Sequence, residues 1–187
     1  DRNGKIKNNF EINGFIKSGK LELLGNHNVS NLNLIFKIKD KEYLLKDIET
    51  EFNQIKLLSN SIKIIPKDNL FLVSGNLKND NKDFDIKKLD TLLESTLKNF
   101  EIKDTNFSSD TNFNLIINKK LKIKNIDLDS KIILNKLKYK PKIKKIKNYL
   151  PNFKEFIDLK DHEILINYKK NKLEINGEGQ IIIENIE

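Results

Sequence analysis

The stretch Thr111–Tyr139, TNFNLIINKKLKIKNIDLDSKIILNKLKY, alternates apolar and polar residues over most of its length. Successive side chains of a β-strand point to opposite faces of a sheet, so this pattern predicts strands with one apolar and one polar face. Most apolar positions from Phe113 to Asn125 carry odd numbers, whereas most of those after Asn125, such as Leu128, carry even numbers. A β-bulge or a turn near Asn125 would therefore be needed to keep them on one face.

The same alternation recurs along much of the chain and is clearest in Leu32–Ile38. Turn residues (Gly, Asn, Ser and Asp) separate the runs at intervals of roughly ten residues, which is typical of an all-β meander. We therefore expect a mainly β fold: a long antiparallel sheet, strongly curved into a U-shaped groove or an open sandwich.

Two segments break this pattern and predict short helices near residues 85–97 and 151–158. In the first, Ile86, Leu89 and Leu93 follow the spacing of three and four that marks one side of a helix. In the second, Pro151 can occupy the first position of a helix, where its missing amide costs nothing.

The 187 residues are enough for one domain or for one part of a larger repetitive protein. The chain begins at Asp1 and contains no Met. We expect residues 1–187 to form a single β-rich segment of a larger, elongated protein. No apolar run approaches the ~18 residues that span a bilayer, which predicts no transmembrane helix in this segment.

The formal net charge of +8 raises the question of a nucleic-acid partner. Arg2 is the only arginine, and the lysines are spread along the strands instead of being clustered. Proteins that bind nucleic acids commonly use Arg forks and aromatic stacking surfaces, so we expect a solvated polar face and no nucleic-acid partner. The absence of Cys excludes disulfides, thiol catalysis and Cys-ligated zinc.

Few residues are candidates for catalysis or metal binding. His27 and His162 are far apart in the sequence and show no metal-ligand spacing. Asp127 and Asp129 lie on one side of a predicted strand, but opposite the apolar residues and among lysines. Phosphate-binding glycine motifs and nucleophile motifs are absent as well. We therefore predict no enzyme activity, no metal and no cofactor.

The apolar face itself is the remaining candidate site. It would be buried if two sheets closed over each other as a sandwich. It would bind a lipid or another chain if the sheet curved around an open groove. Periodicity alone leaves both possibilities open. The candidate lining of a groove consists of apolar residues in the alternating runs: Phe113, Leu115, Ile117, Leu121, Ile123, Leu128, Ile132, Leu134, Ile164, Ile166, Leu173, Ile175, Ile181 and Ile183.

Three features together resemble the AsmA-like envelope proteins, including large bridge-like members with a DUF3971-type domain. They are the alternating run from Phe113 to Tyr139, the segment NYLPNFKEFIDLKDHEILINY (residues 148–168), and the glycine-containing end LEINGEGQIIIENIE (residues 173–187). Leu150-Pro151 stands where some relatives have Trp-Pro.

The resemblance implies a periplasmic segment of a protein that is anchored in the inner membrane by parts outside this chain. Such a segment would carry phospholipids toward the outer membrane, with their acyl chains on the apolar face of a U-shaped β-groove. It would need no catalytic residue. The alternative from another functional class is a structural β-sandwich or adhesin-like module that binds proteins.

Overall fold

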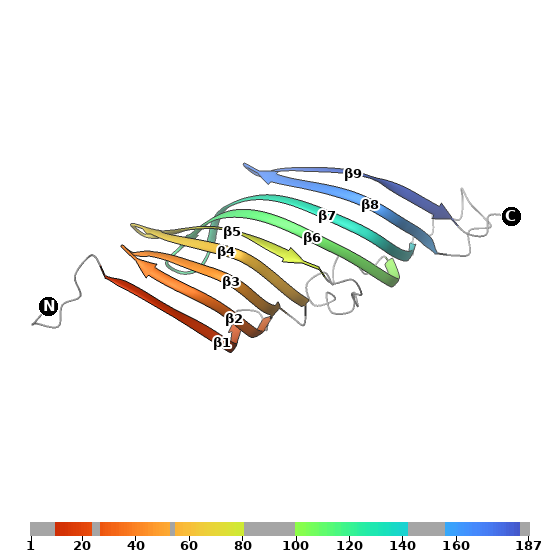
Figure 1. Ribbon diagram of the computed structural model, residues 1–187. Coiled ribbons are helices and arrows are strands. Elements are labelled where there is room, and N and C mark those ends of the chain that lie inside the picture. Colours follow the sequence, from red (N-terminus) through yellow and green to blue (C-terminus); the bar gives the residue numbers. More distant parts are fainter. Residues whose placement is uncertain (1–9, 24–26, 53–54, 81–99, 142–155, 184–187) are drawn as a thin grey trace, which may run out of the picture. The chain divides into compact units, whose positions relative to one another are not determined.

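The structure of the chain is a computed structural model that describes residues 10–23, 27–52, 55–80, 100–141 and 156–183. In these residues, nine β-strands form one sheet, and each strand lies beside the strands that precede and follow it (Figure 1). The strands are β1 (Glu11–Leu23), β2 (His27–Lys39), β3 (Glu42–Phe52), β4 (Ile55–Lys67), β5 (Leu70–Asn79), β6 (Phe100–Asn118), β7 (Ile123–Pro141), β8 (Ile157–Lys169) and β9 (Lys172–Ile183). The predicted mainly β, antiparallel meander is confirmed, but the predicted strong curvature was wrong, because the sheet is neither closed nor strongly curled.

The two predicted helices have different outcomes. The helix at 85–97 lies outside the described residues. The helix at 151–158 also falls mostly outside them, but its last two residues, Ile157 and Asp158, are the first residues of β8. The prediction was wrong there because a short apolar run fits both periods, and pairing with β7 in the sheet decides between them.

The chain divides into two compact units, which are described separately. The first unit comprises residues 1–79, 110–130 and 166–174, and the second comprises residues 80–109, 131–165 and 175–187. The first unit contains the whole of β1 to β5.

In the first unit, the strand register sorts the side chains by polarity. Residues that pair across antiparallel strands lie on the same face of the sheet. One paired row, across β1 to β5, contains only apolar residues and glycine: Gly14, Phe36, Leu45, Ile62 and Gly75. A parallel row contains Ile12, Ile38, Tyr43, Ile64 and Val73. We call the side of the sheet that carries these two rows the apolar face.

The opposite side of the first unit, the polar face, carries more polar and charged side chains, together with some exposed apolar ones such as Phe15 and Ile35, which pair with each other. The row between the two apolar rows contains Asn13, Lys37, Leu44, Lys63 and Ser74. Cross-strand ion pairs connect its strands, with 2.8 Å between Lys37 Nζ and Glu11 Oε1 and 2.8 Å between Lys63 Nζ and Glu42 Oε2. Such half-exposed pairs add little stability, so the polar face mainly serves to hold the sheet in water.

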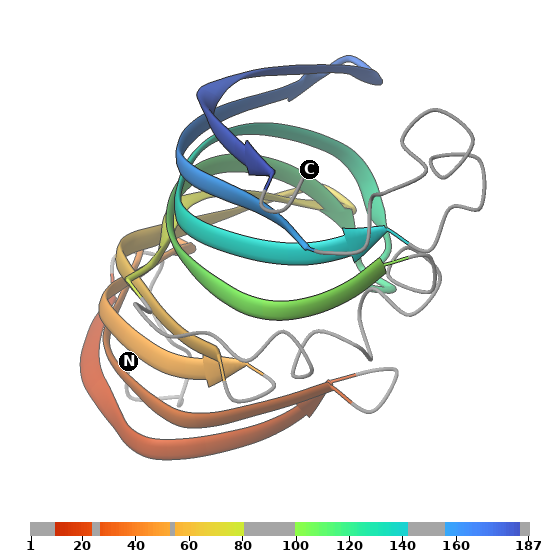
Figure 2. The same ribbon diagram turned by 90° about the vertical axis from the view of Figure 1, so that its right-hand side faces the viewer.

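Bulges keep the apolar residues on one face along each strand. Between two pairings of β2 with β3, Ile35 with Lys46 and Asn33 with Glu49, β2 advances by two residues and β3 by three. The extra residue on β3 accompanies Asp47, whose φ is 50°. Ser18 in β1 and Asn31 in β2 also have positive φ beside shifts in register. Such bulges bend a strand, and β1 to β4 are bent in Figure 2.

The register between β6 and β7 also shifts by one residue, in the stretch where the sequence predicts a bulge or turn near Asn125. The amide N of Asn118 lies 3.0 Å from the carbonyl O of Lys122, which closes the β6–β7 hairpin. The hydroxyls of Thr111 and Ser130 lie 2.7 Å apart across the same strands. From the first contact to the second, β6 advances by seven residues (118 − 111) and β7 by eight (130 − 122). The additional residue of β7 lies between Lys122 and Ser130, in agreement with the prediction.

Candidate functional site

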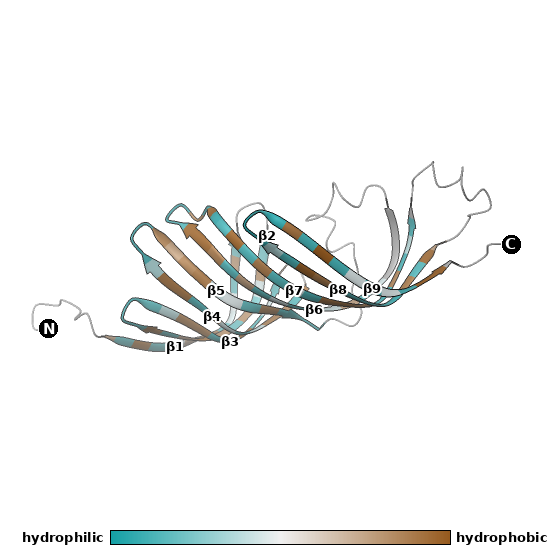
Figure 3. Cartoon of the chain, turned by 90° about the horizontal axis from the view of Figure 1, so that it is seen from above, coloured by the Kyte–Doolittle hydropathy of each residue, from teal (hydrophilic) through white to brown (hydrophobic). Residues whose placement is uncertain are grey.

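The apolar face of the first unit is partly open to solvent: most of its paired side chains are half-buried, and a few are exposed. Ile12 and Ile16 of β1 are 45% and 40% exposed, and Tyr43 of β3 is 37% exposed. Only five apolar side chains among the described residues of the whole chain are buried: Leu34, Ile48, Ile55, Leu134 and Phe156. All described strands belong to one sheet, so no second sheet covers this face in the part of the chain that is described. Brown apolar positions alternate with teal polar ones along the strands in Figure 3.

Aromatic rings lie against glycines on this face. The ring of Phe36 occupies the space that a Cβ at Gly14 would need. A Cβ at Gly75 would lie 3.1 Å from Cζ of Phe113 and 2.9 Å from Cγ1 of Ile62. The glycines therefore allow the rings to lie close to the neighbouring strand, and the apolar surface stays continuous across these positions.

Most of the candidate lining residues of β6 and β7 in the first unit lie on the apolar face. The contact with Gly75 and Ile62 places Phe113 there, and alternation along β6 adds Leu115 and Ile117. Leu128 is two residues before Ser130, whose hydroxyl meets Thr111, and it therefore shares this face as well. These side chains are half-buried.

The candidate Leu121 was placed wrongly, because it lies in the β6–β7 turn and not in a strand. Its φ is 57° and its side chain is 72% exposed. The turn is held by Asn118, whose Oδ1 accepts hydrogen bonds from the backbone amides of Lys120 and Lys122. The next candidate, Ile123, is the first residue of β7 and is 57% exposed.

The remaining candidates of the first unit are Ile166 of β8 and Leu173 of β9. Asp129 of β7 forms a hydrogen bond with Asn167 and a 3.0 Å ion pair with Lys169, so the odd residues of β8 lie on the polar face here. Ile166 is half-buried on the other face, and Leu173 is 59% exposed. The prediction that Asp129 points away from the apolar residues is thereby confirmed.

In the second unit, Leu134 is buried and Ile132 is half-buried on the same side of β7. Asn135 donates a hydrogen bond of 2.7 Å to Asn106 on the opposite side. Ile164 of β8 lies beside Gly177, where a Cβ would be 3.6 Å from its Cγ1.

The last three candidates lie in β9 of the second unit. Two of their side chains are exposed to solvent, and the third lies outside the described residues. Ile175 and Ile181 are 59% and 63% exposed. Ile183 ends β9, but its side chain lies outside the described residues.

The polar side chains show the contacts of an ordinary solvated surface. The ring of His162 lies against Gly179, and its Nδ1 is 3.0 Å from the carbonyl O of Lys160. The side chain of His27 lies outside the described residues. A hydrogen bond from Lys37 lowers the pKa of Glu11, and one to Glu49 raises the pKa of Lys56. In the described part of the chain, no group of three His, Cys, Asp or Glu residues could hold a metal ion.

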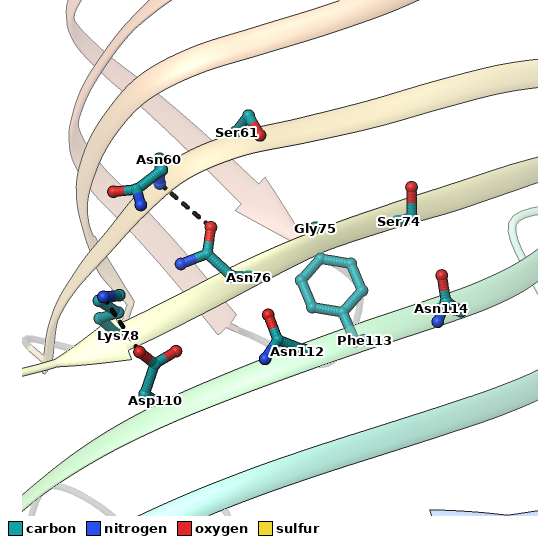
Figure 4. Close-up of a pocket in the computed structure, with 10 residues that line it drawn as sticks. All are labelled: Asn60, Ser61, Ser74, Gly75, Asn76, Lys78, Asp110, Asn112, Phe113 and Asn114. Atoms are coloured by element: carbon teal, nitrogen blue, oxygen red, sulfur yellow. Dashed lines mark hydrogen bonds and ion pairs between the residues drawn. The ribbon is translucent and has the colours of Figure 1, made fainter.

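A depression of about 560 Å³ lies between β4, β5 and β6 in the first unit (Figure 4). Most of its lining consists of the amide and hydroxyl side chains Asn60, Ser61, Ser74, Asn76, Asn112 and Asn114. Its two charged residues, Lys78 and Asp110, form an ion pair of 3.0 Å with each other. The depression therefore offers hydrogen bonds, but neither a base beside a nucleophile nor an apolar lining.

The contacts of Gly14 and Gly75 were missed by the sequence analysis, although a signal for them exists. Each glycine occupies an apolar position of an alternating strand, as Gly14 does between Ile12 and Ile16. A glycine at such a position often marks the close approach of another group. The identity of that group could not be predicted, because Phe36 is distant in the sequence.

No family model, no curated protein and no solved structure matches this chain. No helix in the described residues is long and apolar enough to cross a membrane. The resemblance to AsmA-like proteins therefore rests on sequence features alone.

Proposed function

We propose that this chain is a non-enzymatic segment of an AsmA-like protein of the periplasm, and that it holds or conducts phospholipids between the inner and outer membranes. In this proposal acyl chains lie on the apolar face of the open sheet. The observation that carries the proposal is the partly open apolar face of the first unit, where neighbouring strands place Ile12, Ile38, Tyr43, Ile64 and Val73 side by side.

The energetics favour a ligand with long hydrocarbon chains. Each CH₂ group removed from water contributes about 0.8 kcal/mol, so a continuous apolar surface binds an acyl chain without specific polar contacts. The repeated rows of Ile, Leu and Phe differ little from one another, which lets a chain slide along them. The rings of Phe36 and Phe113 against glycines support this interpretation because they extend the apolar surface over positions that have no side chain.

The alternative is a module that binds another protein through the same face. An exposed apolar surface fits either partner, since both would remove it from water. The two functions predict different molecules on the apolar face. Phospholipid would co-purify with the protein in the first case, and another protein would do so in the second.

A crosslinking experiment separates the two. A photoreactive amino acid at Leu115, on the apolar face of β6, is expected to crosslink to phospholipid when the protein is expressed in a Gram-negative host. The matched control is the same amino acid at the neighbouring Asn114, on the polar face, which should give little lipid adduct. Mass spectrometry of the adducts decides. Equal lipid labelling at both positions, or protein adducts alone at Leu115, would overturn the proposal.

A further inference from the structure

The depression on the polar face of the first unit lies in the middle of the sheet. It extends over β4, β5 and β6, and described strands flank these three on both sides. Ser61 pairs with Lys46, and Ser74 pairs with Lys63, so at both positions a short side chain lies beside a long one. The depression therefore forms where serines interrupt the lysines of the polar face.

Polar side chains of β5 and β6 lie opposite each other in this depression. Figure 4 shows Asn76 beside Asn112 and Ser74 beside Asn114. Two other contacts between these strands, the ion pair and the contact of the glycine with the ring, are offset by three residues on each strand, which fits the same register. The register thus places two rows of neutral polar groups next to one another.

These side chains have hydrogen-bonding groups available for a ligand. Asn76 accepts a hydrogen bond of 3.2 Å from the backbone amide of Asn60 through its Oδ1, and its Nδ2 remains as a donor. Among the residues drawn in Figure 4, the side chains of Asn112 and Asn114 form no hydrogen bond, and both are exposed. Each of these amides offers a carbonyl acceptor and two N–H donors.

This lining fits a neutral ligand that is rich in hydroxyl groups. A hydroxyl both donates and accepts, so adjacent hydroxyls of a sugar ring can bond the carbonyl and the NH₂ group of an amide. Lys78 and Asp110 form an ion pair with each other, so the lining offers no net charge to an acidic or a basic ligand. A peptide fits less well, because β4, β5 and β6 are each paired on both sides and cannot add a further strand.

We propose that the depression over β4, β5 and β6 binds a neutral sugar unit of a glycan through the side-chain amides of Asn76, Asn112 and Asn114. Water competes for these exposed amides, so a single sugar unit binds weakly. The site lies on the opposite face from the apolar rows, and its occupation does not depend on lipid binding.

The first test measures which glycans the full chain retains. The chain is held on streptavidin through a biotinylated tag, so that several copies act together on a surface that displays neutral, acidic and amino-sugar oligosaccharides. Neutral glycans should be retained equally at low and high salt. Attraction of acidic glycans by the net charge of +8 should disappear at high salt because salt screens it. Retention of no neutral glycan, or a preference for charged glycans at high salt, would overturn the proposal.

Leucine variants locate the site. Asn112→Leu and Asn114→Leu remove the hydrogen-bonding groups but keep a side chain of similar size, and each should weaken binding of the retained neutral glycan about two- to tenfold. Asn13→Leu makes the same change at an exposed position of the polar face on β1 and should bind as the wild type does. Circular dichroism checks that the variants fold. Wild-type binding by folded variants at both 112 and 114 would contradict the proposed site.

An NMR titration of the wild type distinguishes a sugar from a peptide and needs no variant. The retained glycan should shift the side-chain amide signals of Asn112 and Asn114 and leave that of Asn13 unchanged. A neutral peptide of four serines, which carries hydroxyls on a peptide backbone, should shift them less. A larger response to the peptide, or no response of these two amides to the glycan, would rule out a glycan at this site.

Discussion

At the scale of single residues, several glycines of the described strands lie so close to a ring or to backbone that a side chain would not fit. A Cβ at Gly75 would lie 2.8 Å from the carbonyl O of Ser61 and 3.1 Å from the ring of Phe113. A carbonyl cannot move aside as a flexible side chain can. At Gly177, by contrast, a Cβ would meet Glu163 and Ile164 at ordinary contact distances of 3.5 and 3.6 Å.

We therefore expect Gly75→Ala to lower the free energy of unfolding by about 1–3 kcal/mol, because the methyl group overpacks the contact with Ser61 and Phe113. Gly177→Ala is the matched control and should be neutral or stabilising by up to ~1 kcal/mol, since alanine reduces the entropy of the unfolded chain. Urea unfolding of both variants measures the difference. Equal stability of the two would contradict the close approach at Gly75.

The ion pair between Lys37 and Glu11 gives a prediction about titration. The hydrogen bond from Lys37 lowers the pKa of Glu11 from its ordinary value of 4.5. Lys37→Gln should raise that pKa, and NMR titration of the Glu11 carboxyl carbon measures the change. A carboxyl whose folded pKa is depressed adds stability above its unfolded pKa, and this contribution is lost as pH falls through the folded pKa. The variant should therefore lose less stability than the wild type between about pH 5 and the folded pKa.

At the scale of single elements, bulges decide which way a strand presents its side chains. Tyr43 and Leu45 occupy odd positions of β3, and Ile48 and Phe52 occupy even ones. The extra residue at Asp47 compensates for this change of parity. Aspartate tolerates the left-handed conformation better than most residues, whereas a β-branched side chain is strongly disfavoured there.

Asp47→Val should consequently lower the free energy of unfolding by about 1–2 kcal/mol through backbone strain. Asp47→Gly should leave it nearly unchanged, because glycine adopts a φ of 50° without a steric cost. Thermal unfolding followed by circular dichroism compares the two. A valine variant as stable as the glycine variant would mean that Asp47 is not held at positive φ.

The strands were predictable from the sequence because period-two alternation is a local property. Even the change of parity in Thr111–Tyr139 was visible, and it corresponds to an additional residue of β7. The end of the helix predicted at 151–158 was not correct, because Ile157 and Asp158 pair within the sheet. The position of Leu121 was also wrong, since a turn residue can occupy an apolar position of the pattern without facing the sheet.

At the scale of the whole molecule, the open question is what covers the apolar face. Sequence periodicity was compatible with a core or an open groove. In the first unit the described structure leaves Ile12 and Tyr43 substantially exposed and places no second sheet over them. A partly open face of this kind lowers its free energy by binding an apolar partner.

If that partner is lipid, Ile12→Lys should reduce the phospholipid that stays with the protein in native mass spectrometry. Loss of roughly 1 kcal/mol of apolar contact corresponds to about fivefold weaker binding. The variant should still fold because Ile12 is 45% exposed. Asn13→Lys adds the same charge on the polar face and should retain the lipid. Equal lipid content in the two variants would contradict lipid binding at this face.

The sequence by itself determined which side chains of a strand share a face, because adjacent residues of extended backbone point in opposite directions whatever surrounds them. Only the tertiary structure decided the register, the contact of Phe113 with Gly75, and the exposure of the apolar rows. These features depend on strands that are distant in the sequence. Local alternation in Thr111–Tyr139 carries no information about which strand lies alongside it or about what covers the sheet.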